Sequence, residues 1–105
     1  KNYDLKKYSS IKSIKIKKLV DSLKKEKKIE RFKSKKFLMV LFYKKNVVCT
    51  GWMFKGLKWH ITEVNKVINI KDKILLYDFF TLPKFRNKGY YSKLLNLIKN
   101  YLLYL

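Results

Sequence analysis

The stretch that decides the fold reads FFTLPKFRNKGYYSKLL and covers residues 79–95. Its apolar beginning is typical of a strand. Pro83, the only proline of the chain, ends that strand because proline cannot continue a hydrogen-bonded ladder. A basic turn with a single glycine, Gly89, follows, and from there the apolar residues recur at helical spacing. The stretch therefore predicts a strand, a tight turn and a helix in direct succession.

The junction between this strand and this helix predicts an anion site. The first N–H groups of a helix have no partner within it, and the helix dipole adds partial positive charge at the same place. Such a corner binds phosphate or pyrophosphate with little help from side chains. Gly89 would let the backbone approach the anion closely, while Arg86 and Lys88 add full positive charge, with Lys84 as a further candidate.

The predicted helix runs from residue 89 to the end of the sequence. Its apolar face consists of Tyr91, Leu94, Leu95, Ile98, Tyr101, Leu102 and Leu105. A helix that ends in YLLYL should pack on something beyond residue 105, so we interpret the chain as a piece of a longer protein.

Upstream, the pattern predicts lysine-rich helices followed by strands. Residues 4–10 read as a short strand or a loop, and the segment from residue 10 to about residue 36 as one or two helices. Residues 37–43 and 47–54 are rich in β-formers around a short polar turn, which predicts an antiparallel hairpin. Gly51, inside the second of these strands, indicates a bulge or a close backbone contact.

The region before the opening stretch predicts further strands. Residues 59–70 read as extended, and residues 67–70 and 74–82 as a second hairpin around 71–73. Because residues 74–82 are apolar on both faces, we expect that strand to be central and covered on both sides. The order of elements predicts an α+β fold with a mixed, mostly antiparallel sheet and helices on both faces, in a single domain over residues 1–105.

The net charge of +20 over 105 residues would attract nucleic acid or another polyanion. However, the basic residues are nearly all lysines, with arginine only at positions 31 and 86. Asn, Ile, Tyr and Phe are also abundant, and all of these residues have codons rich in A and T. Codon bias therefore accounts for much of the charge, and nucleic-acid binders use more arginine.

The rarest residues limit the chemistry. Cys49 and His60 are the only cysteine and the only histidine, so neither an internal disulfide nor a cysteine-based zinc site can form, and we predict no metal. A single thiol indicates a reducing compartment, which predicts a cytoplasmic protein. No segment approaches the roughly 18 consecutive apolar residues of a membrane span, so we expect no membrane association.

Residues 75–98, with the sequence LLYDFFTLPKFRNKGYYSKLLNLI, resemble motif A of the Gcn5-related N-acetyltransferase (GNAT) superfamily. That motif joins a strand to a helix through a turn of the form Arg/Gln-x-x-Gly-x-Gly/Ala. Arg86 and Gly89 match its first two fixed positions, whereas Tyr91 stands where the family has Gly or Ala and must turn its ring away from the pyrophosphate. The lead-in also matches, at Leu82, Pro83 and Phe85.

The resemblance extends over most of the chain, although only motif A is specific. The predicted hairpin is similar to the second and third strands of the family, and the lysine-rich helices to its first two helices. The later strands and the fourth helix have no counterpart, which implies a truncated GNAT-like three-layer fold.

The resemblance implies transfer of an acetyl group from acetyl coenzyme A to a small amine, such as an amino sugar, an amino acid or a polyamine. Main-chain groups of Phe80, Thr81 and Leu82 would pair with the pantetheine arm, and a strand N–H would polarise the thioester carbonyl. The backbone that would hold the pyrophosphate belongs to Arg86, Asn87, Lys88, Gly89, Tyr90, Tyr91 and Ser92.

The candidate catalytic base is Asp78, which interrupts the apolar strand just before the cofactor segment. Burial would raise its pKa toward a useful range. The alternative interpretation is a structural Asp that is hydrogen-bonded to a neighbouring loop, and Glu63 is a weaker candidate for the base.

Two other functions fit the same residues. The chain could be a basic nucleic-acid-binding module whose aromatic side chains stack on bases. It could also be a catalytically inactive relict of the acetyltransferase fold that is retained for binding. The sequence identifies neither the acceptor nor the general acid, and it does not decide the oligomeric state.

Overall fold

The computed structural model describes residues 2–56, 58–61, 66–69 and 74–103. In chain order, its strands and α-helices are β1 (Tyr3–Tyr8), α1 (Lys17–Lys25), β2 (Lys36–Tyr43), β3 (Asn46–Lys55), β4 (Lys58–Ile61), β5 (Lys66–Asn69), β6 (Ile74–Thr81) and α2 (Tyr90–Leu103). Short 3-10 helices complete the path: η1 (Ile11–Ser13), η2 (Ile29–Ser34) and η4 (Pro83–Phe85).

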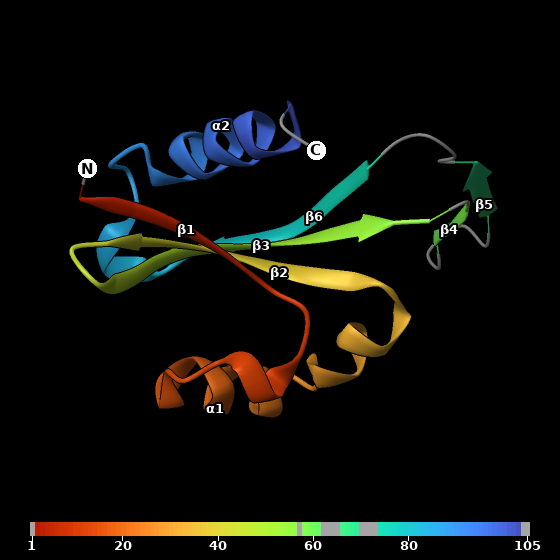
Figure 1. The fold of residues 1–105 in the computed structure, drawn as a ribbon, viewed down its shortest axis with the longest axis horizontal. Helices are drawn as coiled ribbons and strands as arrows, with labels where there is room; N and C mark the ends of the chain where they lie inside the picture. The colour runs from red at the N-terminus through yellow and green to blue at the C-terminus, as the bar shows by residue number, and fades with distance from the viewer. Residues whose placement is uncertain (1, 57, 62–65, 70–73, 104–105) are drawn as a thin grey trace.

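Four of the strands form one sheet in the order β1-β2-β3-β6, and each neighbouring pair is antiparallel. Helix α2 covers one face of this sheet, while α1 and the 3-10 helices near it cover the other (Figure 1). The prediction of an α+β fold with helices on both faces is confirmed. Residues 4–10 were predicted to form a short strand or a loop. The first five of them, residues 4–8, belong to β1.

The predicted antiparallel hairpin of residues 37–43 and 47–54 is confirmed as β2 and β3, and these two strands lie at the centre of the sheet. Five consecutive residues of β2, at positions 38–42, are buried, so both faces of this strand are covered. The connecting turn places Lys44 and Lys45 at φ of 49° and 69°. Two successive positive φ values belong to the tight turn whose twist matches that of the flanking strands.

The alternation of side chains along β2 and β3 creates two cores. The core under α2 contains Met39, Leu41, Val48, Cys49, Met53, Leu94 and Ile98. The core under α1 contains Ile14, Leu23, Leu38, Val40, Phe42 and Trp52. Because successive residues of a strand point to opposite faces, one hairpin supplies both cores.

The prediction of a second hairpin from residues 67–70 and 74–82 was wrong. Strand β5 pairs with β4 in a separate two-stranded sheet, and β6 pairs with β3. The β-propensity of a segment indicates that it forms a strand, but it does not specify which other strand it pairs with. Residues 62–65 and 70–73, which include parts of the predicted extended segment and turn, lie outside the described residues.

Strand β6 was also predicted to be central, and this was wrong within the described sheet. It lies at an edge, and none of its residues is fully buried. Phe80 is 45 % exposed. Its other apolar side chains, such as Ile74, Leu76 and Tyr77, are partly buried against the two cores. A continuous apolar run does not distinguish such an edge strand from a fully covered central one.

Candidate functional site

A β-bulge interrupts the pairing of β6 with β3. Thr50 is opposite Phe80 and Trp52 is opposite Tyr77, so two residues of β6, at positions 78–79, lie opposite Gly51 alone. A side chain at position 51 would place its Cβ 2.6 Å from the ring of Phe79. The predicted bulge or close contact at Gly51 is confirmed. Bulges bend a strand, re-aim its side chains and recur beside functional sites.

Asp78 occupies the bulge with a φ of 51°, a left-handed conformation that Asp adopts more readily than most residues. Its carboxylate accepts a hydrogen bond from Arg31 Nη1 at 2.7 Å and lies 3.0 Å from Lys28 Nζ. The guanidinium of Arg31 also lies 5.1 Å from the ring centroid of Trp52. These contacts connect Lys28 and η2 to β6.

The pKa of Asp78 lies below its ordinary value of 3.8. Desolvation raises this pKa, but the hydrogen bonds and charges of Arg31 and Lys28 lower it by more in total. The expectation of a raised pKa was therefore wrong, because nothing in the sequence indicated these two partners. Glu63, the weaker candidate for the base, lies outside the described residues.

The C-terminal end of β6 presents backbone groups at an open edge. The Leu82 N–H donates to the carbonyl of Val48 at 3.1 Å, toward β3. Backbone groups alternate along a strand, so those of Thr81 point to the opposite edge. Among the described residues, no strand pairs with that edge. Arg86 reaches it, because Arg86 Nε donates to the Thr81 carbonyl at 2.9 Å.

The turn after β6 directs unpaired amides to the same corner. Asn87 and Gly89 have φ values of 63° and 80°, and the Lys93 N–H donates to the Gly89 carbonyl at 3.0 Å as α2 begins. The N–H groups of residues 90–92 precede this first helical bond and have no acceptor within the helix. Apart from Gly89 and its two chain neighbours, no described atom lies within 4 Å of where a Cβ at Gly89 would be, so the space at this residue is open.

These features line a shallow groove of about 430 Å³. The groove is lined by Phe79, Phe80, Thr81, Phe85, Arg86, Asn87, Gly89, Tyr90, Tyr91 and Ser92. The structure thus brings most of the predicted cofactor residues together, while Leu82 and Lys88 do not line the groove. The Leu82 N–H is already bonded to β3, which removes that donor from the outer edge.

Tyr91 lies in the wall of this groove. It is 51 % exposed, and its ring meets that of Phe79 edge-on at 5.4 Å between centroids. The prediction that Tyr91 belongs to the buried face of the helix was wrong. The ring of Tyr91 packs against Phe79 of β6 and leaves the space at Gly89 open. A tyrosine can therefore replace the Gly or Ala of the motif without covering the amides.

Sequence reasoning missed several residues that shape the site. Phe79 and Phe85 line the groove, and both stand inside the stretch that carried the prediction. Lys28 and Arg31 hold Asp78, yet they lie far from it in sequence. The only available signal was that Arg31 is one of just two arginines.

In the part of the chain that the structure describes, no group of three or more His, Cys, Asp or Glu side chains could hold a metal ion. No helix there is long and apolar enough to cross a membrane. The comparisons with family models, with curated proteins and with solved structures found no match.

Proposed function

We propose that the chain is an N-acetyltransferase domain that takes its acetyl group from acetyl coenzyme A and transfers it to a small amine. The observation that carries the proposal is the groove at the β6–α2 junction. It combines an open strand edge, the unpaired amides of a helix N-terminus and an arginine within one continuous surface. The resemblance of residues 75–98 to motif A supports the same assignment.

The two parts of the groove suit the two parts of the coenzyme. The pantetheine arm contains amide groups, which can pair with an open strand edge as an added strand does. Thr81 offers its N–H there, whereas its carbonyl accepts from Arg86 in the structure. The pyrophosphate would lie on the amides of residues 90–92, where the helix dipole favours negative charge. Bound coenzyme would supply the activated acetyl group.

Arg86 would complete the anion site. Its guanidinium has five N–H donors, and the bond from Nε to Thr81 uses one of them. The ring of Phe80 lies 5.2 Å from the centre of the guanidinium and restricts its position. Arg86 is therefore held beside the groove with donors available for a phosphate oxygen.

The incoming amine must lose a proton before it attacks the thioester, which requires a base or a chain of water molecules. Asp78 is ionised and holds two cations, so accepting a proton would weaken both ion pairs. We therefore assign Asp78 a positioning role. Its ion pairs hold the bulge in place, and the bulge determines the direction in which β6 continues toward the groove.

A thermal-shift titration with acetyl coenzyme A tests the proposal. A ligand that binds only the native state at about 100 times its dissociation constant adds about 2.7 kcal/mol to the free energy of unfolding. For a domain of this size, that corresponds to a rise of roughly 10 to 20 °C in melting temperature. Release of the free thiol during incubation with amino sugars, amino acids and polyamines then tests transfer.

The same experiment separates the alternative functions. A nucleic-acid-binding module would bind an oligonucleotide with a steep dependence on salt, and acetyl coenzyme A would leave its melting temperature unchanged. That result would reject the proposal. A relict of the fold would show the melting shift but release no thiol with any amine, which would reject catalysis and leave the coenzyme site standing.

A further inference from the structure

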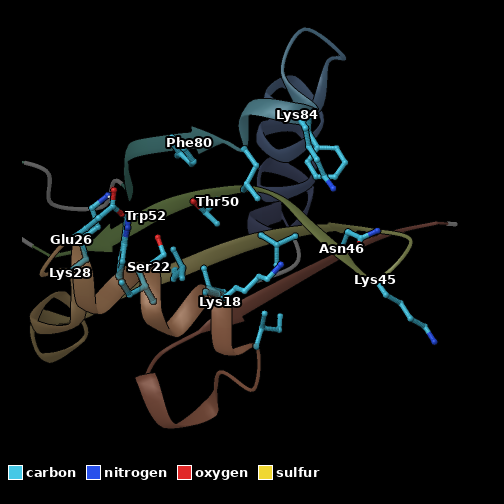
Figure 2. A pocket seen from close by; sticks show the side chains of 17 residues that line it. Lys18, Ser22, Glu26, Lys28, Lys45, Asn46, Thr50, Trp52, Phe80 and Lys84 are labelled. Carbon is cyan, nitrogen blue, oxygen red and sulfur yellow. The ribbon is translucent and has the colours of Figure 1, made fainter.

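A second hollow lies on the α1 face of the sheet. It encloses about 320 Å³ between α1, the β2–β3 hairpin and the end of β6 (Figure 2). Its apolar lining includes Leu19, Leu23, Leu38, Val47, Trp52 and Leu82. Phe80 and Phe85 line both this hollow and the groove, so the two are adjacent.

The hollow has the size and lining of a small-molecule site. A water molecule takes about 30 Å³ in the liquid, so the volume suits a body of roughly ten non-hydrogen atoms. Leu38 and Trp52, at 1 % and 2 % exposure, belong to the core under α1 and give the hollow a fixed back wall. Binding pockets are commonly apolar with a few polar groups at defined places.

The charges around the hollow are unevenly distributed. Glu26 and Lys28 lie at one end, beside Trp52 (Figure 2). Lys28 Nζ is 3.3 Å from Glu26 and 3.0 Å from Asp78, so carboxylates neutralise the lysine at this end.

The opposite end carries uncompensated positive charge. Lys84 lies there with Asn46, and the side chain of Lys18 extends from α1 along the hollow (Figure 2). Lys45 also contributes to the lining, but Figure 2 shows its side chain extending away. Within the described residues, none of these three lysines has a carboxylate within ion-pair distance.

We propose that this hollow binds a small carboxylate with an apolar body, with its head at Lys18 and Lys84. The apolar part of the ligand would be buried against the apolar lining, and the lysines would attract the carboxylate. The end at Glu26 does not compete for the anionic head, because its lysine is already paired with carboxylates. The site lies on the α1 face and does not require acetyl transfer.

Tryptophan fluorescence tests this site directly, since Trp52 forms part of its wall. The chain has two tryptophans, so a Trp59→Phe background leaves Trp52 as the reporter. Titration with octanoate should give a saturable change in emission. Octylamine, with the same chain length and the opposite charge, should bind at least about tenfold more weakly, and the affinity for octanoate should fall in high salt.

Two pairs of surface variants on α1 locate the ligand. Lys18→Glu should raise the dissociation constant of octanoate about tenfold, whereas Lys17→Glu, its exposed neighbour that does not line the hollow, should change it by less than about threefold. Ser22→Leu should fill the hollow and abolish binding, while Lys25→Leu, away from the lining, should not. All four positions are exposed, and circular dichroism checks that each variant folds.

The proposal is overturned if octylamine binds as tightly as octanoate, if the two glutamate variants behave alike, or if the fluorescence of Trp52 does not change. Lys18→Glu should retain the melting shift with acetyl coenzyme A. In the unsubstituted protein, a melting shift with acetyl coenzyme A but no binding of octanoate rejects only the hollow. Binding of octanoate without the melting shift rejects only the coenzyme site.

Discussion

Charged groups lie at the bulge within β6 and in the turn that follows this strand, and the two places use them differently. At the bulge, Asp78 is paired with Arg31 and Lys28, so charge is satisfied inside the protein. After the strand, Arg86 and the first turn of α2 present positive charge to an open groove. Charge that is internally paired contributes to stability, whereas unpaired donors beside open space are available to a ligand.

This comparison changes the roles that the sequence suggested. Asp78 was expected to act as a base, and Arg86 to contact the coenzyme. The pairing with Arg31 and Lys28 lowers the pKa of Asp78, and we propose that Asp78 anchors the bulge instead of acting as a base. Arg86 makes one bond to the backbone and remains exposed.

The largest effect should come from filling the space at Gly51. Gly51→Ala should lower the free energy of unfolding by about 2 kcal/mol, because its Cβ would overlap the ring of Phe79. In a Phe79→Ala background the same substitution should cost less than about 1 kcal/mol. Urea denaturation of all four proteins measures the coupling. Equal costs in the two backgrounds would show that the ring does not hold the bulge against Gly51.

The next effect concerns binding. Arg86→Ala should weaken acetyl coenzyme A about tenfold, or about 1.4 kcal/mol, because the groove loses its arginine. Lys99→Ala removes the same charge from the exposed C-terminal part of α2 and serves as the matched control. Isothermal titration calorimetry measures both. If Lys99→Ala weakens binding as much, the attraction is a general effect of net charge and the groove has no special role.

A smaller effect should appear in the pH dependence of stability. Because the pKa of Asp78 is lower in the folded protein, its ion pairs stabilise the fold above the unfolded value of 3.8. This contribution disappears as the pH falls through the folded-state pKa. Asp78→Asn should therefore cost about 1 kcal/mol at pH 7, a modest amount because the side chain is 35 % exposed and water screens its charge.

The measurement is the free energy of unfolding of both proteins from pH 7 to pH 2. Asn tolerates the left-handed backbone at position 78, so the comparison isolates the charge. The two curves should converge once the pH falls below the folded-state pKa of Asp78, which lies under 3.8. A difference that stays constant over the whole range would mean that Asp78 acts through its shape and not through its charge.

Local patterns in the sequence were enough to predict much of this fold. The hairpin of β2 and β3 has apolar runs on both sides of a short polar turn, and α2 has a helical period after a proline and a glycine. Most groove residues were predicted for the same reason, since the segment at 79–92 folds back on itself within one turn. Contacts between near neighbours in sequence are those that local chemistry specifies.

Contacts between distant segments could not be predicted in this way. Arg31 and Asp78 lie 47 residues apart, and no spacing rule connects them. The edge position of β6 depends on which strands pair, which its apolar composition does not specify. Tyr91 was assigned to the buried face because it matched the helical period, but Tyr can remain at a surface with its ring against Phe79.

The most direct test of the central claim is an NMR titration of the isotope-labelled protein with acetyl coenzyme A, followed through its backbone amides. We expect the largest shifts at Thr81, Tyr90, Tyr91 and Ser92, where the open strand edge meets the helix N-terminus. The amides on the exposed side of α1 should stay in place. Shifts concentrated among the lysines of α1, or an unchanged spectrum at saturating coenzyme, would contradict the account.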